Sequence, residues 1–377
     1  MGVRGSCALI IYLCNTPATH PVFLAGGYNE LNQLSGQNVQ DVLTTAGLAC
    51  IAIAILRPLA LRYNILLDVP FGRKQHHAPI PCIGGIGIVA ALLAGLALGT
   101  ATVFHSQPGF FMGLLGIFVL GIADDRHDLS PKMKLLLEVP LILIALWSFP
   151  SFPFFEETLS LPILIAKASG LGCATFLLLG FLNALNMTDG IDGLAGFISL
   201  FHAAMCAGLA ISFGQSDIAA VALGLVGALI GFLLFNFRTP FGLKALVFLG
   251  DAGSMVLGFT LAWLSLSLTQ HGLPEGLVLW LMSYPTFDSV STALRRMMKG
   301  KNPMEGDRTH LHHLLPGIGL SSVTTVMVIG VISASLTAFG FWLWHCQASN
   351  LSLIGAWFLA GAIYVVTTIF LEAKVTE

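Results

Sequence analysis

Acidic residues stand at the ends of long apolar stretches of this chain. A charged side chain at the centre of a bilayer costs about 2.5–3.5 kcal/mol on insertion scales, and two adjacent carboxylates also repel each other. A bound cation neutralises such groups, and Mg²⁺ is the usual ion where carboxylates and phosphates meet. The acids that end or interrupt an apolar run are Asp124, Asp125, Asp189, Asp192 and Asp251. They predict a metal site that is assembled from the ends of membrane helices.

Two amides precede one of these acidic pairs. Asn183, Asn186, Asp189 and Asp192 recur at every third position, which keeps them roughly on one face of a helix. Gly190 permits a loosened backbone and the close approach of a ligand. Packing alone hardly explains four polar groups at a membrane boundary, so we interpret them as part of a site.

Basic and histidine side chains form a second kind of candidate. They can donate hydrogen bonds and positive charge to phosphate oxygens, as a diphosphate or a phosphorylated lipid would require. Together with the amides of Asn183 and Asn186, they make up the candidates for substrate binding: Arg73, Lys74, His76, Lys134, Arg308, His310, His312 and His313.

Simpler explanations exist for each segment. Arg73 and Lys74 also fit the positive charge that cytoplasmic loops carry. Asp124 could belong to a solvated helix end with local ion pairs, and Asp251 could be an ordinary cap at a helix N-terminus. Three histidines within residues 310–313 suggest zinc, but no cysteine lies nearby and the sequence contains no H-E-x-x-H motif.

The composition decides the class of fold. The chain of 377 residues is 56% hydrophobic and 10% charged, whereas a soluble domain carries about 25% charged residues. This excludes a soluble protein and predicts an all-α polytopic integral membrane protein with about eleven transmembrane helices. The expected spans are 42–62, 83–103, 108–123, 134–150, 160–182, 192–212, 217–236, 248–268, 274–294, 323–345 and 351–371.

The basic residues predict the orientation of these spans. If loop 63–82 is cytoplasmic, alternation places all of the 17 Lys and Arg residues inside except Arg4 and Lys167. The N-terminus is then outside and the C-terminus cytoplasmic. Residues 42–377 are expected to form a single membrane catalytic domain, and 1–41 an N-terminal extension of unclear status.

The polar loops lie on the inner side in this topology, and the outer loops are short. A carrier of a phosphorylated solute would instead place ionisable groups near the membrane midplane, facing a cavity. Glu138 and Asp288 come nearest to such positions, and both lie within roughly two turns of the inner surface. The pattern therefore favours a membrane enzyme over a transporter.

Taken in order, these segments resemble those of the bacterial polyprenyl-phosphate N-acetylhexosamine-1-phosphate transferases, glycosyltransferase family 4. The resemblance runs over about 42–320 and includes the adjacent acidic pair, N-x-x-D-G-x-D-G from Asn186, a glycine-flanked Asp251, and D-R-T-H-L-H-H from Asp307. The histidine motif is similar to that of the WecA-like branch, whereas the enzyme that makes lipid I carries a longer histidine run.

The resemblance implies a reaction. N-acetylglucosamine-1-phosphate would pass from UDP-GlcNAc to undecaprenyl phosphate, with release of UMP, as the first step of a lipid-linked cell-envelope glycan such as a lipopolysaccharide O-antigen or a cell-wall polymer. The cofactor would be Mg²⁺, for which Mn²⁺ can substitute. Phospho-N-acetylmuramoyl-pentapeptide transfer, or another UDP-N-acetylhexosamine, remains an alternative within the family.

The resemblance also implies roles for individual residues. Asn186 and Asp251 would hold the metal and the diphosphate, and Lys134 a phosphate. The acids of the reaction would be Asp124, Asp125, Asp189, Asp192 and Asp251. The expected partners are the two substrates and the lipid bilayer of the bacterial inner membrane, with no nucleic acid, and a homodimer stays open.

The topology can be tested with reporter fusions. Green fluorescent protein fused within the loops 183–192 or 295–322 should fluoresce, because these loops are expected in the cytoplasm. Alkaline phosphatase fused within 213–216 or 269–273 should be active, because these loops are expected outside. The reverse pattern at the acidic loop 183–192 would contradict a reaction at the cytoplasmic face.

Overall fold

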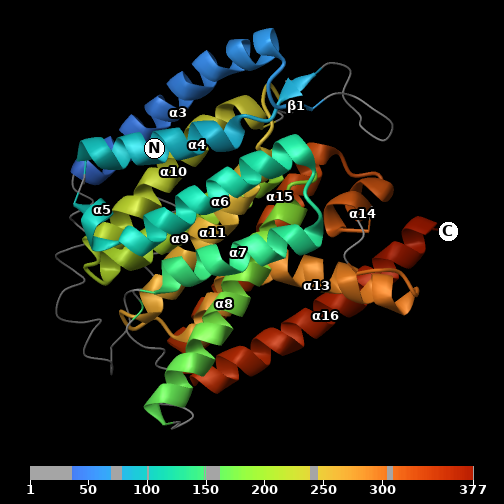
Figure 1. Cartoon of the computed structure of the whole chain (residues 1–377). Coiled ribbons are helices and arrows are strands. Elements are labelled where there is room, and N and C mark those ends of the chain that lie inside the picture. Colours follow the sequence, from blue (N-terminus) through green and yellow to red (C-terminus); the bar gives the residue numbers. More distant parts are fainter. Residues whose placement is uncertain are drawn as a thin grey trace, which may run out of the picture.

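The structure is a computed structural model that describes residues 36–68, 79–99, 102–147, 149, 162–237, 245–303 and 309–376. Within these ranges the chain is helical apart from its turns and a two-residue antiparallel pairing of β1 (Leu67–Asp68) with β2 (Ile80–Pro81). Figure 1 shows the long helices side by side in one bundle, with α3 at one edge and α16 at the other. The helices are α3 (Gly36–Tyr63), α4 (Gly84–Gly99), α5 (Val103–Ser106), α6 (Pro108–His127), α7 (Pro131–Leu146), α8 (Ile163–Thr188), α9 (Leu194–Ser212), α10 (Ser216–Asn236), α11 (Gly250–Thr269), α12 (Glu275–Leu281), α13 (Ser283–Met298), α14 (Leu311–Gly317), α15 (Ser322–His345) and α16 (Asn350–Thr376).

Helix α11 is the centre of the bundle. Every residue from Ala252 to Thr269 is buried, and α11 packs against α4, α6, α8 and α9. Its aromatic residues interlock with those of α6, as in the parallel stacking of Phe259 on Phe110 at 5.9 Å between ring centroids. A helix that is apolar on all sides is suited to such a central position.

Small residues let the neighbouring helices approach α11 closely. A Cβ atom at Gly85 of α4 would lie 2.3 Å from the backbone nitrogen of Gly253, and one at Gly121 of α6 would lie 2.4 Å from the Cα of Ala252. Without a hydrophobic driving force between helices in lipid, packing at this distance is a main source of association. The contacts fix the first turn of α11 between α4 and α6.

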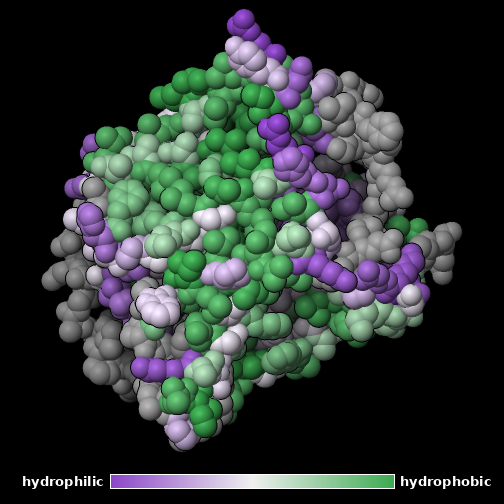
Figure 2. Space-filling model, in the orientation of Figure 1, coloured by the Kyte–Doolittle hydropathy of each residue, from purple (hydrophilic) through white to green (hydrophobic). Residues whose placement is uncertain are grey.

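The outer helices present apolar side chains to their surroundings. On α16, Phe358, Ile363 and Phe370 are exposed, while the buried residues of α3 fall along one face that includes Ala49 and Ile53. Figure 2 shows hydrophobic residues across the middle of the visible face and hydrophilic ones mainly toward its edges. Exposed apolar faces of this kind are suited to lipid.

The protein is therefore an all-α polytopic membrane protein, as the composition predicts. Among the described residues, eight helices are long and apolar enough to cross a membrane: α3, α6, α8 from Leu164, α9, α10, α11, α15 and α16. The full count of eleven spans and their orientation remain predictions.

The three further expected spans differ from the others in length. Helices α4 and α7 have 16 residues each, or about 24 Å at 1.5 Å per residue, which is shorter than a hydrocarbon core of about 30 Å. The expected span 274–294 is divided at Met282 into α12 and α13. Each is a poor match to a continuous span by length alone.

Other boundaries also differ from expectation. Helix α8 continues to Thr188 rather than ending near 182, so Asn183 and Asn186 lie on its last turns. The expected loop 295–322 contains a short helix, α14. Both changes bring polar side chains of the proposed site onto regular helices.

The close contact between α6 and α11 predicts the effect of a single methyl group. Gly121→Ala should lower the free energy of unfolding by about 1–3 kcal/mol, because the added Cβ would overlap the α11 backbone. Thermal unfolding of the purified protein, followed by tryptophan fluorescence, measures the change. Gly180→Ala in α8 is the matched control, since a Cβ there meets nothing within 4 Å. It should be neutral or slightly stabilising, and equal losses for the two variants would contradict the packing argument.

Candidate active site

The polar ends of four helices meet at one end of the bundle, near α14 (Figure 1). They are the C-terminal ends of α6 and α8 and the N-terminal ends of α7 and α11. The turn between α8 and α9 and the histidines around α14 complete the group.

Asp125 of α6 caps the central helix. Its Oδ1 accepts a hydrogen bond from the backbone N–H of Asp251 at 2.7 Å, and its Oδ2 accepts one from the N–H of Ala252 at 3.0 Å. The first amides of a helix have no partner within the helix, and a carboxylate there is also stabilised by the helix dipole. Gly250, with a φ of 75°, makes room, since a Cβ there would lie 2.9 Å from Asp125 Oδ2.

Asp251 is thereby free to point across to α8. Its Oδ1 accepts a hydrogen bond from Asn186 Nδ2 at 2.6 Å, and the same nitrogen donates to Ser254 Oγ at 2.8 Å. The capping role considered for Asp251 from the sequence thus belongs to Asp125. Asn186 and Asp251, which the resemblance pairs at the metal, are in direct contact.

Helix α7 supplies a basic and an acidic group. Lys134 forms an ion pair with Asp124, whose Oδ1 also accepts the N–H of Leu129 at 2.9 Å. One turn further on, the fully buried Glu138 accepts a hydrogen bond from Asn183 Nδ2 at 2.8 Å. The α7 side chains therefore connect the end of α6 to the end of α8.

The turn between α8 and α9 carries Asp189 and Asp192. The N–H of Gly193 donates to Asn236 Oδ1 at 2.8 Å, and Asn236 Nδ2 donates to the carbonyl of Val247 at 2.9 Å. Asn236, at the end of α10, therefore links the acidic turn to the segment that leads into α11 through hydrogen bonds.

Asp189 experiences the combined negative charge of the site. Desolvation among its packed neighbours, followed by the charges of Asp251, Asp192 and Asp125, raises the pKa of its carboxyl from 3.8 to about 8. Burial and the repulsion between like charges both disfavour the ionised carboxyl. A positive charge placed here would be strongly favoured.

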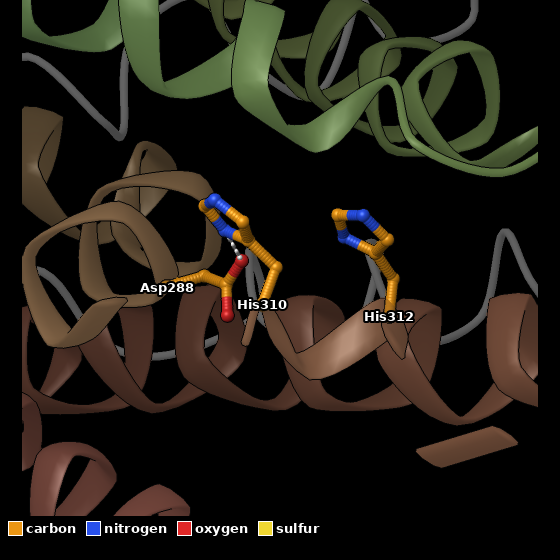
Figure 3. A group of neighbouring side chains, drawn as sticks. All are labelled: Asp288, His310 and His312. Carbon is orange, nitrogen blue, oxygen red and sulfur yellow. Dashed lines mark hydrogen bonds and ion pairs between the residues drawn. The ribbon is translucent and has the colours of Figure 1, made fainter. Parts of the chain in front are cut away.

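The histidine motif faces this turn. A Cβ at Gly190 would lie 2.0 Å from His312 Nε2, so the ring of His312 lies directly over the acidic turn. The rings of His310 and His312 are nearly parallel, with centroids 5.4 Å apart. The ring centroid of His313 lies 4.3 Å from that of His312. Figure 3 shows the rings of His310 and His312 pointing away from their own backbone in the same direction. The carboxylate of Asp288 lies beside the ring of His310.

The donor set around Asp251 fits Mg²⁺. Mg²⁺ is usually held by one or two carboxylates together with waters and substrate phosphates rather than by a closed protein cage. Asp251 offers carboxylate oxygens and Asn186 an amide oxygen, and the two side chains are joined through Asn186 Nδ2. Lys134 offsets only part of the negative charge that several neighbouring acids contribute. The chemistry of the residues thus agrees with the predicted cofactor, which itself remains a proposal.

Most of the predicted site residues are brought together by the structure. Asp124, Asp125, Lys134, Asn183, Asn186, Asp189, Asp192, Asp251, His310, His312 and His313 all lie at this end of the bundle. Arg73, Lys74, His76 and Arg308 lie outside the described residues.

The structure also adds residues that were not assigned to the site from the sequence. Ser254 follows Asp251 by one helical turn, a spacing that could have indicated it. Glu138 and Asp288 stand out in the sequence only as charges within apolar spans. Asn236 gives no local signal, since its partners come from two other segments.

An all-α membrane bundle that gathers carboxylates, amides, a lysine and histidines at its helix ends is a membrane-embedded enzyme rather than a carrier. The model of glycosyl transferase family 4 matches residues 107–269. A relative from Salmonella typhi, named undecaprenyl-phosphate alpha-N-acetylglucosaminyl 1-phosphate transferase, is 32% identical over 300 residues, which cover 77% of this chain and 79% of the relative.

Two further relatives agree. The protein of the same name from Escherichia coli (strain K12) is 29% identical over 280 residues, covering 73% of this chain and 76% of the relative. A Bacillus subtilis (strain 168) protein, named probable undecaprenyl-phosphate N-acetylglucosaminyl 1-phosphate transferase, is 30% identical over 295 residues, covering 75% and 79%. The chain belongs to glycosyl transferase family 4, and it is a phosphotransferase.

Burial of His312 predicts a pH dependence of stability. Burial first, and the neighbouring His313 and His310, lower the pKa of His312 from 6.5 to about 3, against the opposing effect of Asp288. Between these values the unfolded chain binds a proton that the folded chain does not, so stability should fall as the pH decreases below about 6.5. The loss from this one residue is at most about 1.4 kcal/mol per pH unit.

The comparison of wild type with His312→Gln isolates this contribution. Thermal unfolding at pH 7.5, 6.0 and 5.0 should show a smaller acid-induced loss in the variant, because glutamine does not titrate. Parallel losses in the two proteins would mean that His312 does not stay neutral when the pH is lowered.

Proposed function

We propose that this protein transfers N-acetylglucosamine-1-phosphate from UDP-GlcNAc to undecaprenyl phosphate, with Mg²⁺, and releases UMP. The observation that carries the proposal is the contact of Asn186 with Asp251 at the capped N-terminus of α11. It brings together an amide and a carboxylate that are far apart in sequence and that match the positions associated with metal and diphosphate. The names of the relatives supply the substrates.

The proposed reaction brings two anionic substrates together. A phosphate oxygen of the lipid forms a bond to the phosphorus that carries the sugar, and the bond from that phosphorus to the oxygen of UMP breaks. Transfer of this kind needs mainly positioning and compensation of charge. When bound by Asp251 and Asn186, Mg²⁺ would supply the positive charge that screens the two phosphates and the departing UMP.

The residues around the cation have separate tasks. Lys134, which is paired with Asp124, would turn to a phosphate oxygen and release that carboxylate. His310, His312 and His313 face the acidic turn from the opposite side and would hold the nucleotide sugar. Asp125, with both oxygens bound to amides of α11, would keep Asp251 in place.

The nucleophile needs little activation. A phosphate monoester has its second pKa at about 6, so much of the lipid phosphate is dianionic at pH 7. We favour direct attack, with Asp124 orienting the lipid phosphate or accepting its last proton. A double displacement through an aspartyl-phosphate intermediate is the rival, and it would trap a labelled sugar-phosphate on the protein without lipid.

The location of the reaction follows from the charge pattern. We place the site at the cytoplasmic face of the bacterial inner membrane, because alternation of the expected spans assigns all Lys and Arg residues except Arg4 and Lys167 to the side where α6 and α8 end. Phospho-N-acetylmuramoyl-pentapeptide transfer remains the second candidate within the family. The described residues offer no feature that favours a homodimer over a monomer.

The direct test is an assay of UMP release. Purified protein is mixed with undecaprenyl phosphate, Mg²⁺ and UDP-GlcNAc, and a parallel reaction contains UDP-N-acetylmuramoyl-pentapeptide. Release of UMP with UDP-GlcNAc alone would support the proposal. Release only with the pentapeptide substrate would move the protein to the second candidate, and no release with either, from folded protein, would reject the function.

Asp251→Asn should reduce the turnover number by a factor of at least about 10³, because the cation loses its anionic ligand at this position. The neutral amide is similar in shape and can still meet Asn186, so the fold should persist. Initial rates of UMP release across a series of Mg²⁺ concentrations measure the effect.

A matched control removes a hydrogen bond of the same amide without removing charge. Ser254→Ala takes away one acceptor of Asn186 and should reduce turnover by less than about tenfold. Near-normal rates for Asp251→Asn at low Mg²⁺ would show that Asp251 does not hold the metal.

A further inference from the structure

Asp288 of α13 is fully buried, and the structure accounts for both of its carboxylate oxygens. Its Oδ2 lies 2.8 Å from His310 Nδ1, and its Oδ1 accepts hydrogen bonds from the N–H of Leu311 at 2.9 Å and the hydroxyl of Tyr364 at 3.0 Å. The backbone N–H and the tyrosine hydroxyl both donate to this carboxylate. An imidazole is a stronger base than a carboxylate, so the proton between Oδ2 and Nδ1 is assigned to His310 Nδ1, and Asp288 is ionised and only accepts.

From this geometry we infer that Asp288 is a positioning residue for the proposed transfer reaction, acting through His310. It fixes the ring with Nδ1 protonated and Nε2 directed at the nucleotide sugar, where Nε2 donates to a phosphate oxygen when it also carries a proton. The inference rests on the proposed function. His312 supports this orientation of the His310 ring, because the two rings are nearly parallel and the Nε2 of His312 lies over Gly190 of the acidic turn.

The backbone before His310 is fixed in the same way. Arg295 Nη2 donates to the carbonyl of Thr309 at 2.5 Å and to Thr292 Oγ1 at 3.0 Å. Glu372 of α16 lies 3.6 Å from Arg295 Nε and accepts from Lys299 Nζ at 2.8 Å. Helices α13 and α16 therefore form a support that holds the histidine motif from behind.

This support lies outside the segment matched by the family model, which ends at residue 269. Tyr364 belongs to the last helix, α16, and touches the carboxylate that orients His310. The final helix thus contributes to the site through two hydrogen bonds in series, although it carries none of the motifs.

A metal centre is the competing interpretation of the same side chains. Asp288, His310 and His312 each offer a ligand atom within 4.8 Å of the others. Two ligands at about 2.0 Å from a tetrahedral zinc ion would stand about 3.3 Å apart, whereas the Asp288 Oδ2 to His310 Nδ1 distance is 2.8 Å. That distance is typical of a hydrogen bond between an imidazole and a carboxylate, so the geometry favours positioning.

The test is a double-mutant cycle on UMP release. Asp288→Asn keeps the shape of the side chain but loses the fixed acceptor, and should lower kcat by a factor of at least about 10², with a smaller change in KM. In the His310→Ala background the same substitution should change kcat by less than about twofold, because its target is already gone. Tyr364→Phe, which removes one donor to Asp288, should cause a loss of less than about tenfold.

Ser291→Ala is the matched control for damage to the helix pair. Ser291 Oγ lies 2.6 Å from Thr368 Oγ1, so this variant also breaks a buried hydrogen bond between α13 and α16, yet it does not touch Asp288. It should keep its activity even if it unfolds at a lower temperature. If both variants lose activity in proportion to their loss of thermal stability, Asp288 has only a structural role.

Two results would overturn the inference directly. One is an undiminished effect of Asp288→Asn in the His310→Ala background. The other is one equivalent of zinc in the purified protein that is lost in His310→Ala, which would define a metal centre.

A readout that does not need turnover separates this inference from the proposed function. In protein with ¹⁵N-labelled histidine, the NMR signals of the His310 ring are those that disappear in His310→Ala. They should show Nδ1 protonated in wild type and a mixture of tautomers in Asp288→Asn. If wild type releases no UMP but shows this pattern, the function is wrong while the fixed tautomer stands. A His310 that is protonated only at Nε2 would contradict the inference whatever the activity.

Discussion

The capping of α11 by Asp125 is the interaction on which the rest of the site depends. A helix that is buried along its whole length cannot leave its first amides without partners, because water does not reach them. The two carboxylate oxygens of Asp125 satisfy the amides of Asp251 and Ala252, and the close approach at Gly121 makes this reach possible. The position of Asp251, and through it that of Asn186, follows from this one cap.

The electrostatics of the site indicate which ligands it would accept. Burial first, and then the charges of Asp251, Asp192 and Asp125, raise the pKa of Asp189, while Lys134 compensates Asp124. Such an excess of negative charge favours a cation and opposes a bare phosphate. A site of this kind would accept metal and diphosphate together, which is how Mg²⁺ is commonly held beside phosphorylated substrates.

The site has two sides with different supports. The acidic side is built on the central helices α6, α8 and α11, within the segment matched by the family model. The histidine side is held by α13 and α16 through Asp288, Arg295 and Tyr364. Both sides meet where His312 lies over Gly190, a position at which an added Cβ would overlap the His312 ring.

The sequence by itself determined the membrane class, the mostly helical fold, the family, and the residue types that gather at the helix ends, because hydrophobic runs and motifs are local patterns. It did not determine that Asp125, rather than Asp251, caps α11, that Asp288 and Tyr364 stand behind His310, or that Asn236 holds the acidic turn. These contacts join residues from 22 to 127 positions apart. The span 274–294 is divided at Met282, which its own apolar pattern does not show. Only the packing of helices against α11 decides which of the many polar groups become neighbours.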